Sequence, residues 1–117
     1  MSKNYTLSTI EDSLVLQVFN LRGEYENKQT LRAVMSKIDG GFPNFVVDLS
    51  KIEFMNSVGL NFLISLKKQS KASGSQLALA NVSKKIIQLL EITKLRPMFF
   101  ITNSVEEALQ AFSAYEG

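Results

Sequence analysis

A serine at residue 57 lies in a segment whose residue types can support regulated chemistry. The segment FMNSVGLNF (residues 54–62) stands where a predicted strand and its connection end and a helix begins. The first amides of a helix are unpaired and carry partial positive charge, which favours a phosphate placed there. A phosphoserine adds about −1.5 to −2 charge. Ser57 is therefore a candidate switch that acts on a partner by repulsion and bulk, and Gly59 would let that partner's backbone approach.

The same serine has a simpler interpretation as a helix N-cap. Serine is a preferred N-cap residue and is worth about 1 kcal/mol over alanine. Gly59 would then be only a small residue in a tightly packed first turn. On the local pattern alone, capping is the commoner role for a serine at Ser57.

Catalysis and metal binding are predicted to be absent. The chain contains no histidine and no cysteine, which removes the commonest general base, the commonest metal ligand and all thiolate chemistry. Asp48 ends a predicted strand, as the phosphoacceptor of a receiver domain does. That chemistry needs an acidic pair and a late lysine, but Glu11 and Asp12 fall in a predicted turn and no lysine closes the last strand. We expect Asp48 to accept backbone hydrogen bonds, and we expect no enzyme activity, cofactor or metal.

Composition indicates one folded domain spanning residues 1–117. The hydrophobic fraction is 45% and the charged fraction 21%, close to average globular usage. The net charge of +2 is too small to argue for nucleic acid or a membrane surface as a direct partner. The first residues lack the apolar core of a signal peptide, and no apolar run is long enough to span a bilayer. A cytoplasmic location without membrane insertion is the expectation.

Hydrophobic periodicity predicts the element order β-β-α-β-α-β-α-β-α. Two alternating segments around a polar break at residues 11–13 predict an N-terminal β-hairpin. Apolar residues at helical spacing predict the helices. Strands that alternate with helices imply an α/β fold with a mostly parallel sheet of about five strands and four helices. The expected strands are residues 5–10, 14–21, 45–49, 76–81 and 98–101, and the expected helices start near Asn27, Ser57, Ser83 and Ser104, the second ending before Gly74.

Several motifs in this order resemble the STAS domain of anti-sigma-factor antagonists. The most telling run is VVDLSKIEFMNSVGLNFLISLKK (residues 46–68), which looks like the family's apolar strand, short link, M-D-S-[ST/A]-G-L-G motif and amphipathic helix. Other segments agree in order and spacing, so that the resemblance covers nearly the whole chain. They are LRGEYE (21–26), GSQLALAN (74–81), SKKIIQLLEITKLRPMFFI (83–101) and SVEEALQAF (104–112).

The resemblance implies a partner-switching role in signal transduction and transcription regulation. Antagonists of this family bind a GHKL-type serine kinase that is also an anti-sigma factor, and so free the sigma factor. Phosphorylation of the motif serine, which corresponds to Ser57, releases the kinase, and a PP2C-type phosphatase reverses the modification. The residues implied in partner binding are Asn56, Ser57, Val58, Gly59, Glu26 and Asn27.

The chain departs from the family pattern at three positions. Asn56 replaces the aspartate before the serine, Glu26 replaces an aspartate after the second strand, and Asn61 replaces a glycine. Glu26 keeps the charge, and Asn61 falls within a predicted helix. Asn56 can accept a hydrogen bond but carries no charge and takes no proton. This leaves an alternative open, in which the chain is a constitutive STAS subunit of a lipid-transport or scaffold complex without serine phosphorylation.

Overall fold

The computed structural model describes residues 4–39 and 41–116, with side chains described up to residue 113. Its elements follow the predicted order β-β-α-β-α-β-α-β-α, with a short 3-10 helix (η1) before the last strand. The strands are β1 (Tyr5–Ile10), β2 (Ser13–Val18), β3 (Asn44–Asp48), β4 (Gln76–Ala80) and β5 (Phe100–Thr102). The helices are α1 (Glu24–Asp39), α2 (Ser57–Ser73), α3 (Lys84–Ile92), η1 (Arg96–Met98) and α4 (Val105–Glu116).

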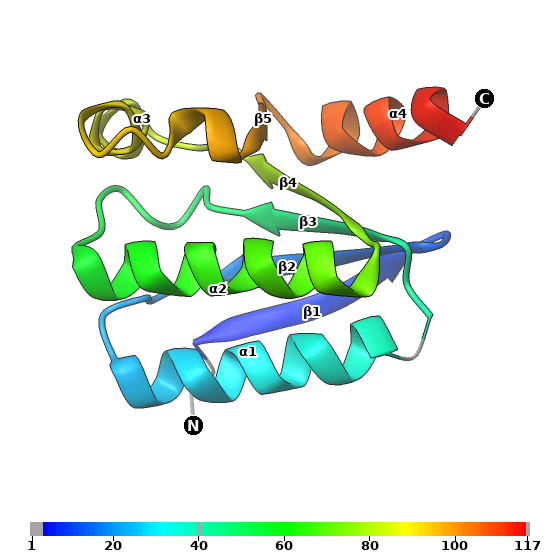
Figure 1. Ribbon diagram of the computed structural model, residues 1–117, viewed down its shortest axis with the longest axis horizontal. Coiled ribbons are helices and arrows are strands. Elements are labelled where there is room, and N and C mark those ends of the chain that lie inside the picture. Colours follow the sequence, from blue (N-terminus) through cyan, green and yellow to red (C-terminus); the bar gives the residue numbers. More distant parts are fainter. Residues whose placement is uncertain (1–3, 40, 117) are drawn as a thin grey trace.

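The five strands form one sheet in the order β1-β2-β3-β4-β5 (Figure 1). β1 and β2 pair antiparallel, with Tyr5 opposite Val18 and Ile10 opposite Ser13. Every other neighbouring pair is parallel. The predicted hairpin and mostly parallel sheet are therefore confirmed. The carboxyl ends of β2, β3 and β4 consequently lie at one end of the sheet, on the left in Figure 1.

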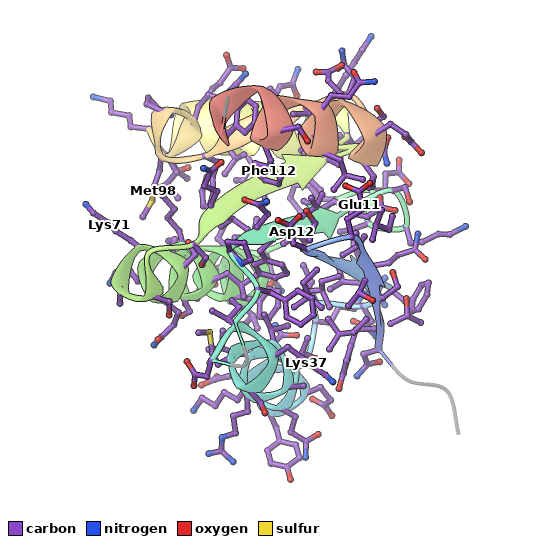
Figure 2. The ribbon with its side chains drawn as sticks, turned by 90° about the vertical axis from the view of Figure 1, so that its right-hand side faces the viewer. Glu11, Asp12, Lys37, Lys71, Met98 and Phe112 are labelled. Atoms are coloured by element: carbon purple, nitrogen blue, oxygen red, sulfur yellow. The ribbon has the colours of Figure 1, made fainter. Side chains whose placement is uncertain are left out.

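Two apolar clusters hold the helices against the sheet. The larger cluster contains Leu16, Phe45 and Leu63 and includes side chains from α1, α2 and α3. The smaller one joins Val46 and residues of β4 to α4, whose Phe112 is buried between the helix and the sheet (Figure 2). β3 is buried along its whole length, because both of its faces are covered.

The ends of α2 and α3 follow local sequence signals. α2 ends at Gly74, which adopts the left-handed conformation with φ 74° and returns its amide to the last carbonyls of the helix. Ser83 caps α3, and its hydroxyl accepts a hydrogen bond from the Ile86 amide at 3.2 Å. Both boundaries were predicted. In the described part of the chain, no helix combines the length and the apolar character needed to cross a membrane.

The connection between β2 and α1 differs from the prediction. β2 ends at Val18 rather than at residue 21, and α1 begins at Glu24 rather than at Asn27. The expected helix start followed the apolar period, which the first turn of α1 lacks. Glu24 and Glu26 instead favour that turn, because carboxylates are stabilised near the positive end of a helix. Residues 19–23 therefore form a short surface connection.

Candidate functional site

The predicted site residues gather at the end of the sheet where the parallel strands finish. Two connections meet there, residues 19–23 between β2 and α1 and residues 49–56 between β3 and α2. The first turns of α1 and α2 start beside them (Figure 1). In open α/β sheets this end is the usual place for a binding crevice.

Asn56, and not Ser57, caps helix α2. The Asn56 side-chain oxygen accepts hydrogen bonds from the amides of Val58 at 3.0 Å and Gly59 at 3.4 Å. Ser57 is the first helical residue, and its side chain is exposed. Within residues 4–39 and 41–113, no group forms a hydrogen bond with its hydroxyl. The interpretation of Ser57 as the N-cap is therefore wrong, because the asparagine one position earlier already satisfies the first free amides of the helix.

Gly59 is buried in the first turn of α2 against Met55. A Cβ atom at this position would lie 2.8 Å from the Met55 Cβ and 3.3 Å from its sulfur. Because Cβ atoms in real structures do not approach another side-chain atom as closely as 2.8 Å, the connection before the helix would have to move. The lack of a side chain at Gly59 thus sets how closely residues 49–56 fold over α2, while Val58 beside it remains half-exposed.

Glu26 and Asn27 lie in the first turn of α1, and Asn27 holds the 19–23 connection. Asn27 is 6% exposed, and its amide donates a hydrogen bond to the Leu21 carbonyl at 2.9 Å. The exposed Glu26 carboxylate lies over Gly23. The buried Asn27 hydrogen bond therefore fixes the connection against the start of α1.

Asp48 anchors the beginning of the 49–56 connection at the end of β3. It accepts three hydrogen bonds of 3.0 Å, from the Ser50 amide, the Asn81 side chain and the Gln17 side chain. Burial alone raises the pKa of this carboxyl, but the hydrogen bonds from Asn81, Ser50 and Gln17 outweigh it, and the pKa of Asp48 is lowered. The expectation that Asp48 accepts hydrogen bonds from the following loop is confirmed.

Helix α3 anchors the middle of the same connection. The Ser83 hydroxyl donates a hydrogen bond to the Glu53 carbonyl, and Lys85 forms an ion pair with the Glu53 carboxylate at 3.3 Å. The Asn56 cap fixes the other end. Residues 49–56 are therefore held at both ends and in the middle, so their exposed side chains project from a well-defined backbone.

A small groove separates the first turns of α1 and α2. Its volume is about 160 Å³. Two predicted site residues, Asn27 and Val58, line opposite walls of it, which places the start of α1 beside the start of α2. The full lining is Glu24, Asn27, Lys28, Leu31, Val58, Asn61, Phe62 and Ser65.

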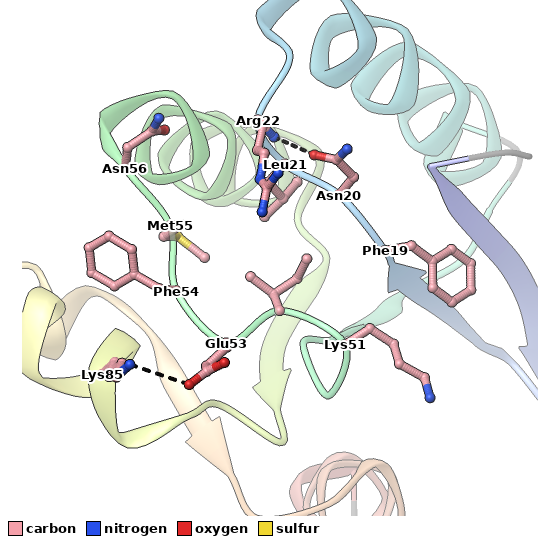
Figure 3. Close-up of a pocket in the computed structure, with 11 residues that line it drawn as sticks. Phe19, Asn20, Leu21, Arg22, Lys51, Glu53, Phe54, Met55, Asn56 and Lys85 are labelled. Atoms are coloured by element: carbon pink, nitrogen blue, oxygen red, sulfur yellow. Dashed lines mark hydrogen bonds and ion pairs between the residues drawn. The ribbon is translucent and has the colours of Figure 1, made fainter.

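A larger open cleft lies between the two connections, on the other side of Asn56 (Figure 3). Its volume is about 710 Å³. Figure 3 shows Phe19 and Phe54 at opposite ends of it, with Arg22 above and Lys51 and Glu53 below. Hereafter it is called the basic cleft. Its lining is Phe19, Asn20, Leu21, Arg22, Lys51, Ile52, Glu53, Phe54, Met55, Asn56 and Lys85.

The structure brings together some of the predicted site residues and adds others. Ser57 lies in the chain between Asn56, which lines the basic cleft, and Val58, which lines the groove. Glu26 lines neither. Apart from Asn56, the residues that line the basic cleft were not predicted from the sequence. The exposed aromatic Phe54, two residues before the predicted serine, was a usable signal. Among the described residues, no group of three or more His, Cys, Asp or Glu side chains is placed to hold a metal ion.

Comparison with known proteins identifies a family that the chain matches over most of its length. The family model for the STAS domain matches residues 9–108. A similar protein is BtrV of Bordetella bronchiseptica, whose name carries a provisional assignment as an anti-sigma factor antagonist. It is 23% identical over 107 residues, which cover 92% of each chain.

Solved structures share the fold over nearly the whole chain. An anti-sigma-factor antagonist (STAS) domain protein from Planctomyces limnophilus superposes with a TM-score of 0.80 at 23% identity, covering 93% of this chain and 97% of that one. The anti-sigma factor antagonist SpoIIAA in its unphosphorylated form gives 0.76 at 17% identity, covering 94% and 96%. The phosphorylated form of SpoIIAA from Bacillus gives 0.67 at 20% identity, covering 92% and 98%.

Proposed function

Because this chain belongs to the STAS domain family, we propose that it is an anti-sigma factor antagonist that works by partner switching. In this proposal residues 1–117 form a single STAS domain that acts in the cytoplasm by binding rather than by catalysis. Its partner is an anti-sigma factor that is also a GHKL-type serine kinase. A PP2C-type phosphatase resets the switch.

The observation that carries the proposal is the state of Ser57. Its hydroxyl is exposed at the first turn of a helix and has no hydrogen-bond partner among the described residues, because Asn56 performs the capping. A serine that is not needed for the fold is free to be modified. The names of the related proteins support the same role, and one fold neighbour is known in both a phosphorylated and an unphosphorylated form.

In the unphosphorylated state, the surface around Ser57 would bind the kinase. Asn56, Val58 and Asn27 contribute to this surface at the cleft and the groove, Glu26 lies on the adjoining turn, and Gly59 lets the connection lie close to the helix.

Phosphorylation would then release the kinase. Transfer of the ATP γ-phosphoryl group to the Ser57 oxygen adds about −1.5 to −2 charge. The kinase supplies the base that takes the seryl proton, since Asn56 cannot accept one. The start of α2 stabilises the new phosphate by roughly 0.3–1 kcal/mol if it stays exposed, while its charge and bulk oppose the kinase.

The test is an affinity pull-down from native cells with wild type and Ser57→Asp as parallel baits. We expect wild type to retain a GHKL-type kinase that Ser57→Asp loses, with unchanged circular dichroism. Ser113→Asp is a matched control, because Ser113 is also an exposed helical serine but belongs to α4. Incubation of wild type with the captured kinase and ATP, followed by mass spectrometry, should place the phosphate on Ser57. Equal capture by wild type and Ser57→Asp would contradict the proposal.

One observation favours a second candidate function. The Asn56 oxygen is committed to the amides of Val58 and Gly59, so this residue offers no charge and no free acceptor to orient the Ser57 hydroxyl. A constitutive STAS subunit of a lipid-transport or scaffold complex needs no such orientation. For that function, the Ser57→Asp bait should retain the same transporter or scaffold proteins as wild type.

A further inference from the structure

The basic cleft carries a positive charge that the fold itself does not neutralise. Three cationic side chains line it, and one of them, Lys85, is paired with Glu53 at 3.3 Å. Arg22 and Lys51 are exposed, and neither forms an ion pair within residues 4–39 and 41–113. They come from two different connections and both line the cleft. In Figure 3 the Arg22 side chain points into the cleft, whereas the Lys51 side chain lies at its edge and extends away from Arg22. The cleft is therefore complementary to a negatively charged occupant.

The same cleft exposes large apolar side chains. Phe54 is 59% exposed and Phe19 is 39% exposed, while Ile52 and Met55 between them are buried beneath the cleft. Aromatic side chains that remain exposed next to charged ones are typical of the anchor positions of protein interfaces. A purely anionic occupant such as free phosphate would leave these side chains in water, whereas an occupant that also offers apolar surface would cover them.

Both walls of the cleft are already ordered. The Asn20 side chain accepts a hydrogen bond from the Arg22 amide at 2.8 Å, and the Phe19 amide donates to the Asn4 carbonyl at 2.7 Å. The opposite wall is held by the Ser83 hydroxyl, which donates a hydrogen bond to the Glu53 carbonyl. A preorganised site loses little conformational entropy on binding, which favours affinity.

We propose that the basic cleft binds an acidic segment of the partner protein. Carboxylates of this segment pair with Arg22 and Lys51, and one of its aromatic or aliphatic side chains packs against Phe54. The inference rests on the proposed function for the partner's identity, and it adds the chemistry of the partner's surface. A protein segment can supply carboxylates and apolar surface together, which matches the unpaired cations and exposed aromatic side chains of the cleft.

The location of the cleft also links it to the switch. Asn56 lines the cleft, and Ser57 follows it directly in the chain. A phosphate on Ser57 contributes about −1.5 to −2 charge, which is close to the combined charge of Arg22 and Lys51. Phosphorylation would therefore reduce the positive potential that attracts an acidic partner. Ser57→Asp supplies only one negative charge, so it should weaken binding of the partner less than phosphorylation does.

A peptide titration tests the cleft without any knowledge of the partner. The ¹⁵N-labelled protein is titrated to millimolar concentrations with the peptide acetyl-Asp-Glu-Leu-Phe-Glu-Asp-amide and, separately, with its counterpart in which every acid is lysine. We expect the acidic peptide alone to shift the amide signals of residues 19–22 and 51–56. Equal shifts with both peptides, or no shifts in these segments, would overturn the inference. So would binding at this cleft of a single-stranded oligonucleotide but not of the acidic peptide.

Charge reversal then tests the cleft in the full complex with the captured kinase. The double variant Arg22→Glu/Lys51→Glu should weaken binding roughly tenfold or more, because like charges across an interface are strongly unfavourable. Lys68→Glu/Lys71→Glu is the control, since it makes the same change in net charge on the exposed face of α2 and should change binding by less than about twofold. Arg22→Gln/Lys51→Gln repeats the test if the reversed protein does not fold.

The two proposals fail in different ways. A kinase that binds wild type and the reversed variant equally, combined with no peptide shifts, refutes the acidic docking segment while partner switching stands. If the acidic peptide shifts the amide signals of the cleft residues but no kinase is captured, the proposed partner is refuted while the chemistry of the cleft stands.

Discussion

Replacing Asn56 with alanine should destabilise the protein, whereas replacing Ser57 with alanine should not. Asn56→Ala removes the acceptor for the Val58 and Gly59 amides. Loss of an N-cap costs about 0.5–2 kcal/mol. The Val58 amide is exposed enough for water to replace the lost bond, so a value of about 1 kcal/mol is expected.

This loss is large enough to measure by thermal unfolding. An unfolding entropy of about 2.1 cal/mol/K per residue gives about 0.25 kcal/mol/K for 117 residues. Asn56→Ala should therefore lower Tm by about 4 °C, measured by circular dichroism or calorimetry. Ser57→Ala should stay within about 0.5 kcal/mol of wild type, because it removes no hydrogen bond within the described residues.

Two further variants make the comparison specific to the cap. Asn56→Asp keeps the acceptor and adds a negative charge at the positive end of α2, so it should be as stable as wild type or gain roughly 0.3–1 kcal/mol. Asn56→Gly should lose only a few tenths of a kcal/mol. If Ser57→Ala destabilised the fold as much as Asn56→Ala, the serine would share the capping role, and the reasoning that leaves Ser57 free for modification would be refuted.

Other substitutions test the packing and electrostatics around the site. Gly59→Ala should cost about 1–3 kcal/mol in urea denaturation, because the new Cβ meets Met55, whereas Asn61→Ala on the exposed face of α2 should stay within about 0.5 kcal/mol; equal effects would contradict the close approach. Folding lowers the pKa of Asp48. Its charge therefore stabilises the folded state at pH values above the ordinary pKa of about 3.9, and this stabilisation is lost as the pH falls through the pKa of the folded protein. Asp48→Asn should therefore be less stable than wild type at neutral pH, and the difference between their urea midpoints should become smaller below about pH 4. A difference in urea midpoint that does not change with pH would argue against a role for the charge. Gly74→Ala should cost about 1–2 kcal/mol because φ is 74° there, and Gly74→Asn should cost less in the same assay.

Much of the fold could be predicted because its signals are local. The apolar spacing within residues 57–73 and the glycine after them defined α2 to its last residue. Ser104 caps α4 through the Glu107 amide at 3.0 Å, as the S-x-x-E pattern predicts, although the Glu107 carboxylate reaches the Asn103 amide rather than that of Ser104. Such hydrogen bonds join residues a few positions apart, so the sequence contains both partners side by side.

The predictions that failed were those where two local signals compete. Asn56 and Ser57 are both good N-cap residues, and the sequence alone does not say which one adopts the extended backbone that a cap requires. The structure gives Asn56 that conformation, with φ −101° and ψ −166°. The start of α1 was misplaced for a related reason, because its first turn is defined by carboxylates and by the buried Asn27 rather than by an apolar period.

The sequence by itself determined the order of the elements, the α/β class and the serine at the start of α2. Those features depend on periodicity and on capping chemistry, which act within a few residues. Only the tertiary structure decided that Ser57 is left without a structural task and that a basic, partly aromatic cleft opens beside it. Arg22 and Lys51 are far apart in the chain, and they line one cleft because β2 and β3 are parallel neighbours whose carboxyl ends lie at the same edge of the sheet.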